Sequence, residues 1–129
     1  MNTMTRQEET GYRNLDFSGW IRRKLTSETG FTVFDVDFVF RDYRRKLMQI
    51  VEMKVMGGKT TTMQKITMPE IASIFEAGIA AGKPEPGYRW LGYNLLRFEN
   101  TSPENGRIDW NGKLITEDKL IELLEMRHE

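Results

Sequence analysis

The chain contains no cysteine, and its single histidine, His128, is the penultimate of 129 residues. Disulfides, thiolate metal sites and cysteine nucleophiles are therefore excluded. Any metal ion that binds here has to be a hard cation held mainly by oxygen atoms.

Long hydrophobic runs are also missing from this sequence. No stretch approaches the roughly 20 apolar residues of a membrane span, and the first residues lack the apolar run of a signal peptide. We therefore expect a cytoplasmic protein without a membrane partner. The length suits a single domain over residues 1–129, in which the polar and unpatterned residues 1–14 form a flexible amino-terminal arm.

The chain has no net excess of positive or negative charge, since 19 Lys and Arg balance 19 Asp and Glu. The charges are nevertheless unevenly distributed: residues 1–65 carry a net charge of +4, and residues 66–129 carry a net charge of −4. A polyanion would bind the first half in preference to the second. A nucleic acid is one polyanion that such a basic half could bind.

Hydrophobic periodicity predicts an α/β fold with a central mixed sheet flanked by helices. Strict alternation predicts a strand from Phe31 to Arg41, and the short charged link 42–46 predicts an antiparallel hairpin with a second strand from Leu47 to about Met56. Thr67-Met68-Pro69-Glu70 predicts a capping box that opens a helix, or a bend at Pro69 if the helix begins within residues 60–66. The other predicted elements are a helix capped by Asp16, an end of the second helix at Gly82 and Pro84, a strand from Tyr88 to Phe98, a hairpin through Asn111-Gly112 and a final helix capped by Thr116.

Acidic and basic side chains interrupt the two apolar strands of the predicted hairpin. Because side chains alternate along a strand, Asp35 and Asp37 share one face of the first strand, and Glu52 and Lys54 share one face of the second. Phosphodiester hydrolysis uses a cation to polarise the phosphate and to activate the attacking water, and carboxylates can bind that cation. An ammonium can offset the negative charge that grows on the phosphate in the transition state. The pattern therefore favours a divalent-metal site at Asp37 and Glu52, with Lys54 beside it.

Asp37, a gap of fourteen residues and then Glu52-Met53-Lys54 resemble the active-site signature of the PD-(D/E)xK nuclease superfamily. The predicted order of elements over residues 15–100 is similar to its restriction-endonuclease-like core, and Gln64 is similar to the glutamine that follows the motif in RecB-like members. The resemblance implies a nuclease that depends on Mg²⁺ or Mn²⁺ and acts on a nucleic acid, with DNA as the expected partner. Small members are often homodimers. Asp37, Glu52 and the Met53 carbonyl would be metal ligands, and Lys54 and Gln64 would be further catalytic residues. Val36 stands where the family has the proline of its name, and the tyrosine expected after the glutamine is not evident.

Other interpretations fit parts of the same pattern. Glu52 and Lys54 could be an ordinary exposed ion pair, and the chain could be a non-catalytic nucleic-acid- or protein-binding regulatory module on the same fold. The segment from Gly57 to Thr60 is similar to the end of a phosphate-binding loop, although Met53 stands where the full pattern needs glycine. The residues expected to contact a nucleic-acid backbone, unless they form a solvated face, are Arg44, Arg45, Lys46 and Lys59.

Overall fold

The computed structural model describes residues 15–30, 33, 36–55, 62–100, 102–104 and 106–127. They belong to two compact units, Met1–Val33 and Phe34–Glu129, which are described separately. The amino-terminal arm predicted for residues 1–14 lies outside the described residues. Among the described helices, none has the length and apolar character needed to cross a membrane.

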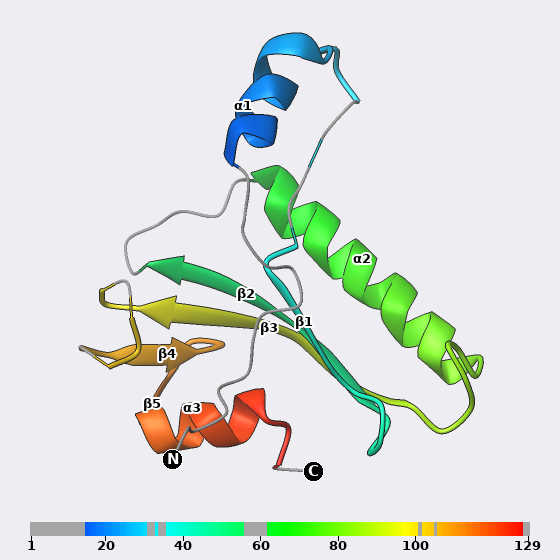
Figure 1. Cartoon of the computed structure of the whole chain (residues 1–129), viewed down its shortest axis with the longest axis vertical. Helices are drawn as coiled ribbons and strands as arrows, with labels where there is room; N and C mark the ends of the chain where they lie inside the picture. The colour runs from blue at the N-terminus through cyan, green and yellow to red at the C-terminus, as the bar shows by residue number, and fades with distance from the viewer. Residues whose placement is uncertain are drawn as a thin grey trace, which may run out of the picture. The chain divides into compact units, whose positions relative to one another are not determined.

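In the first unit, the described helix is α1 (Leu15–Lys24) (Figure 1). Asp16 lies inside its first turn, so the prediction that Asp16 caps the helix is wrong. A carboxylate in the first turn still interacts favourably with the helix dipole, and Arg22, Arg23 and Lys24 do the same in the last turn. Phe17 and Trp20 stack along this helix, with ring centroids 5.9 Å apart.

The second unit is built on a five-stranded mixed sheet with the strand order β1-β2-β3-β4-β5 (Figure 1). Strands β2 and β3 are parallel, and the other neighbouring pairs are antiparallel. The elements are β1 (Phe38–Asp42), β2 (Leu47–Val55), α2 (Thr62–Ala80), β3 (Arg89–Phe98), β4 (Ile108–Trp110), β5 (Lys113–Ile115) and α3 (Glu117–Leu124). The predicted α/β fold with a central mixed sheet flanked by helices is thus confirmed.

The β1–β2 hairpin forms as predicted, but its first strand begins late. Phe38 pairs with Val51, whereas Val36 and Asp37 precede the strand, so the prediction of a strand from Phe31 is wrong at its start. The Asp37 side chain accepts the hydrogen bond of the Met53 backbone N–H. A side chain that accepts a backbone N–H in this way replaces a backbone hydrogen bond between the two strands, and the strand pairing ends there. Asp35 lies outside the described residues.

Helix α2 connects the parallel strands β2 and β3, as a crossover between parallel strands requires. It begins at Thr62 and runs through Pro69, so the alternative start within residues 60–66 is confirmed and the start at the Thr67 capping box is wrong. Proline removes one helical hydrogen bond, and the apolar residues on both sides of it keep the helix continuous. The predicted end is confirmed, because Gly82 has a φ of 88° and the bonds Gly82 N to Ile79 O and Lys83 N to Gly78 O form a Schellman motif.

Strand β3 contains a bulge at Gly92, which has a φ of 102°. Met48 pairs with Trp90 but Ile50 pairs with Tyr93, so β3 has one more residue than β2 in this interval. In a regular strand, residues three positions apart point to opposite faces. Because of the extra residue, Trp90 and Tyr93 point to the same face of the sheet.

The two faces of the sheet are covered by different helices. A core cluster packs α3 against one face and consists of Val51, Leu96, Phe98, Ile108 and Leu120. On the other face, Phe75 of α2 stacks against Trp90 of β3, with ring centroids 5.5 Å apart. Since Glu52 neighbours Val51 along β2, its side chain lies on the α2 face.

The α3 face also contains buried polar side chains that bond to one another. Gln49 is 0% exposed; its Nε2 donates to the Leu123 carbonyl of α3 at 3.1 Å, and its Oε1 accepts from Asn94 Nδ2 at 2.8 Å. Asn94 Oδ1 in turn accepts from Asn111 Nδ2. These bonds connect β2, β3, the β4–β5 turn and α3, and they satisfy amide groups that would be costly to bury alone.

The carboxyl-terminal elements agree with the predictions. Asn111 and Gly112 have φ values of 53° and 85°, as a two-residue turn with two left-handed positions requires, and they connect β4 to β5. Thr116 caps α3, with its hydroxyl oxygen accepting the Lys119 N–H at 3.1 Å.

Candidate functional site

Asp37 and Glu52 meet where β1 begins against β2. Phe38 pairs with Val51, so the preceding residue, Asp37, is opposite the following residue of β2, Glu52. Asp37 Oδ2 accepts the Met53 backbone N–H at 3.0 Å, which fixes the carboxylate against β2. The structure therefore brings together the two acidic residues that the sequence placed on neighbouring strands.

Glu52 lies in a central position of the sheet. Its strand has β1 on one side and β3 on the other, and the side chain is only 6% exposed. Carboxylates are uncommon in such positions, because burial disfavours the charged form unless other groups compensate for lost water. A buried acid in the middle of an apolar strand is therefore a feature that stability alone does not favour.

Lys54 is two residues beyond Glu52 in β2, on the same face of the sheet, and it is half-buried. Its partner across the parallel pairing is Arg97, which is also half-buried. The carboxyl ends of β2 and β3 therefore carry two cationic side chains next to the acidic pair. This arrangement suits a ligand that is itself an anion.

Tyr93 belongs to the same cluster, although it is not among the site residues predicted from the sequence. Burial is the main cause that raises the pKa of its phenol, and the negative charges of Glu52 and Asp37 raise it further. Tyr93 therefore lies close enough to both acids to sense their charge. Its hydroxyl remains protonated over the neutral pH range and can act as a hydrogen-bond donor.

The Met53 backbone is directed to the same place. Within a strand, the N–H and C=O of one residue point toward the same neighbouring strand. The Met53 N–H points to Asp37, so its carbonyl oxygen points toward the edge that β1 leaves open there. A carboxylate offers about four lone-pair positions, so Asp37 keeps acceptor capacity beyond its bond to Met53.

These donors are compatible with a hard divalent cation. No group of three or more acidic, histidine or cysteine side chains able to hold a metal occurs among the described residues. Mg²⁺ does not need one, since it binds proteins through one or two carboxylates and completes its shell with water and phosphate oxygens. Asp37, Glu52 and the Met53 carbonyl supply the oxygen atoms for that mode of binding.

The predicted nucleic-acid contacts lie elsewhere or outside the described residues. Residues Arg44–Lys46 form the hairpin turn at the opposite end of β2, about 20 Å from Glu52 at the rise of an extended strand. The guanidinium of Arg45 donates to the backbone carbonyls of Glu125 and Met126, and Lys46 Nζ donates to the Pro86 carbonyl at 3.0 Å. Both side chains are therefore engaged within the fold.

Two other predicted residues are not placed by the structure. Gln64 lies in the first turn of α2, but its side chain is outside the described part of the chain. Lys59 and the Gly57–Thr60 segment fall in the interval 56–61, which is not described.

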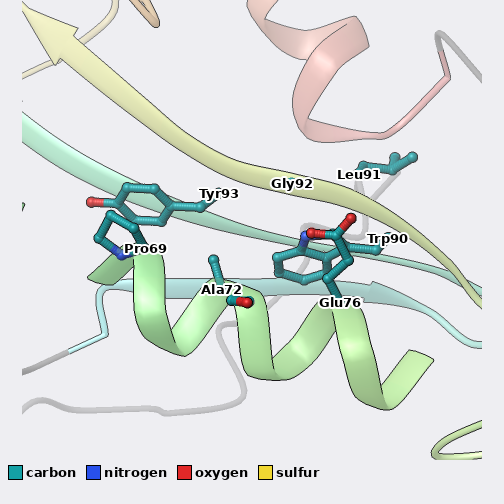
Figure 2. Close-up of a pocket in the computed structure, with 8 residues that line it drawn as sticks. Pro69, Ala72, Glu76, Trp90, Leu91, Gly92 and Tyr93 are labelled. Atoms are coloured by element: carbon teal, nitrogen blue, oxygen red, sulfur yellow. The ribbon is translucent and has the colours of Figure 1, made fainter. Parts of the chain in front are cut away.

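A groove lies between α2 and β3 (Figure 2). Its volume is about 580 Å³. The lining residues are Pro69, Ala72, Ser73 and Glu76 from α2, and Trp90, Leu91, Gly92 and Tyr93 from β3. Tyr93 thus lines the groove and also lies within electrostatic range of the acidic pair.

Tyr93 and Arg97 are the site residues that sequence reasoning missed. Alternation counted from Trp90 assigns Tyr93 to the wrong face, because the count omits the bulge at Gly92. A glycine inside a strand pattern is itself a signal of a bulge and could have corrected the count. Arg97 could be found only from the parallel pairing of β3 with β2.

Comparison with models of protein families, with curated proteins and with solved structures found no match to this chain.

Proposed function

We propose that this chain is a metal-dependent nuclease that hydrolyses phosphodiester bonds in a nucleic acid, with DNA as the expected substrate. The β1–β2–α2–β3 arrangement would then be a restriction-endonuclease-like core, and Asp37, Glu52 and Lys54 would be its PD-(D/E)xK signature. The observation that carries the proposal is the placement of Asp37 against Met53 and opposite the buried Glu52. Lys54 follows on the same face of the sheet.

The chain's own groups have distinct roles in this proposal. Asp37, Glu52 and the Met53 carbonyl would hold Mg²⁺ or Mn²⁺. When bound, the cation supplies polarisation of the phosphate and a lower pKa for a water molecule. The Lys54 ammonium orients the attacking water and offsets the negative charge that grows on the phosphate oxygens. Tyr93, which stays protonated, donates a hydrogen bond toward the same oxygens.

The direct test is a cleavage assay on labelled single-stranded DNA, double-stranded DNA and RNA, with Mg²⁺, Mn²⁺ or a chelator. Wild-type protein is expected to cut at least one substrate only when the metal is present. Removing one preorganised hydrogen-bond donor that stabilises negative charge in the transition state typically lowers the rate by about 10²-fold to 10³-fold. We expect a loss of that order in Lys54→Ala. Lys113→Ala is the matched control, because Lys113 is exposed on β5 at the other edge of the sheet.

Two results would contradict the proposal. Cleavage that survives both Asp37→Asn and Lys54→Ala would show that the activity belongs to another protein in the preparation. Substrate that binds but stays intact under every metal condition would instead indicate a non-catalytic nucleic-acid-binding module on the same fold.

A further inference from the structure

The groove between α2 and β3 has the dimensions of a small-molecule site. Its volume of about 580 Å³ lies within the range of roughly 300–1,000 Å³ that is usual for ligand pockets. The groove also combines apolar walls with a few polar groups, which are the Ser73 hydroxyl, the Glu76 carboxylate and the Tyr93 hydroxyl. This composition suits one planar, partly polar ligand.

An aromatic wall limits one side of the groove. Trp90 lines it, and Phe75 stacks on the indole with an interplanar angle of 20°, which holds the ring in one orientation. The bulge at Gly92 places Tyr93 on the same face as Trp90. A planar heterocycle is the kind of ligand that stacks on such a surface.

The charge of the groove selects which part of a nucleic acid can enter it. Among the described residues that line the groove, Glu76 is the only charged one, and Figure 2 shows its side chain reaching from α2 toward Trp90. A carboxylate repels phosphate and accepts hydrogen bonds from N–H donors. The occupant is therefore a base, and a base with an exocyclic amino group complements the carboxylate better than one without.

The position of Tyr93 connects the groove to the acidic pair. Figure 2 shows its hydroxyl pointing away from Trp90, toward the carboxyl ends of β2 and β3, where Glu52 and Lys54 lie. A nucleotide carries its base and its phosphate on one sugar. With a base next to Trp90, the strand could continue past Tyr93 toward the carboxyl ends of β2 and β3, so that a phosphate further along it would lie nearer to Lys54.

Building on the proposed nuclease function, we infer that this groove is a nucleobase subsite for an unpaired strand, in which Glu76 selects bases that carry an exocyclic amino group. In a duplex the base is stacked and its amino group is already paired, so it cannot enter a groove between a helix and a sheet. The substrate class is therefore a single-stranded nucleic acid, and in DNA cytosine should be preferred over thymine. Cytosine offers its N4 amino group to a carboxylate, and thymine has no equivalent donor.

Binding without cleavage provides the first test. Oligodeoxycytidine and oligodeoxythymidine of equal length are titrated into the protein in the presence of a chelator, and tryptophan fluorescence reports occupancy. We expect oligodeoxycytidine to quench the fluorescence and to bind about tenfold more tightly, the factor that corresponds to one well-placed base contact. The quenching should disappear in Trp90→Phe, which removes the indole that lines the groove.

Glu76→Gln tests the selecting group. A carboxamide can donate as well as accept, so this variant should bind the two oligonucleotides with similar affinity. Glu70→Gln is the matched control, because Glu70 is exposed on the same helix but does not line the groove. It should keep the tenfold preference.

The outcomes separate this inference from the nuclease proposal. Equal binding of the two oligonucleotides by wild-type protein, or an unchanged preference in Glu76→Gln, would overturn the nucleobase subsite even if metal-dependent cleavage is observed. A cytosine preference that Glu76→Gln abolishes would support the subsite even in a protein that cuts no substrate. Tighter binding of duplex DNA than of either single strand would also overturn it.

Discussion

The buried amide of Gln49 should contribute substantially to the stability of the second unit. Gln49→Met keeps a similar side-chain length and volume but removes the donor to the Leu123 carbonyl and the acceptor of Asn94 Nδ2. Leaving a buried polar group unsatisfied costs about 1–3 kcal/mol each. Part of this cost is offset because the thioether is apolar, so we expect a loss of about 2–4 kcal/mol in the free energy of unfolding.

Urea unfolding followed by far-ultraviolet circular dichroism measures this loss. With a typical urea m-value of about 2 kcal/mol/M, the midpoint should fall by about 1–2 M while the slope stays constant. Ile74→Met is the control, since Ile74 is 70% exposed on α2 and its replacement should change stability by no more than about 0.5 kcal/mol.

A double variant sharpens the same test. Asn94→Leu removes the partner amide, so Gln49→Met combined with Asn94→Leu should be less destabilised than the sum of the two single variants. A loss below about 0.5 kcal/mol in Gln49→Met would refute the reasoning, because a buried pair of bonds cannot be removed at so small a cost unless they are absent. Strict additivity would show that the two amides do not act as one network.

Three further predictions concern the bulge, the hairpin turn and the site. Gly92→Ala should destabilise the unit by about 1–2 kcal/mol in urea, because alanine is strained at a φ of 102° even though no atom obstructs its Cβ closely. Hydrogen bonds from the Arg45 backbone and side chain lower the pKa of Asp42 below its usual value of 3.8. The ionised carboxylate therefore stabilises the fold fully above pH 3.8, and this contribution should be lost as the pH falls through the lowered pKa. Asp42→Asn should accordingly flatten the acid limb of a plot of unfolding free energy against pH. The pKa of Tyr93 is raised mainly by burial and further by the charges of Glu52 and Asp37. Glu52→Gln should therefore shift the titration of tyrosinate absorbance to lower pH. An unchanged titration would show that Glu52 does not lie near the phenol.

The acidic pair could be predicted from sequence because it depends on local rules. Alternation assigned faces to Asp37 and Glu52, and a short link between two apolar strands required a hairpin that brought them together. The start of β1 was misjudged for a related reason. Asp37 uses its side chain to bond the Met53 backbone, and a hydrophobic pattern cannot show which donor a carboxylate will take.

Features that depend on long-range neighbours could not be predicted. The hairpin-turn arginine Arg45 looked available to nucleic acid, but its two terminal guanidinium nitrogens donate to carbonyls some eighty positions away, just after α3. Likewise, Tyr93 reaches the site because a bulge in β3 shifts its face and because β3 pairs in parallel with β2. Pro69 resembled a helix start, although α2 passes through it.

Divalent-metal binding by Asp37 and Glu52 is the claim on which the functional proposal depends. Isothermal titration with Mn²⁺ tests it without any substrate, using wild-type protein, Asp37→Asn, Glu52→Gln and the control Asp118→Asn on the exposed first turn of α3. The proposal predicts a binding isotherm in wild-type protein and in Asp118→Asn that is lost in both site variants. Equal heats in all four proteins, or none in the wild type, would contradict it.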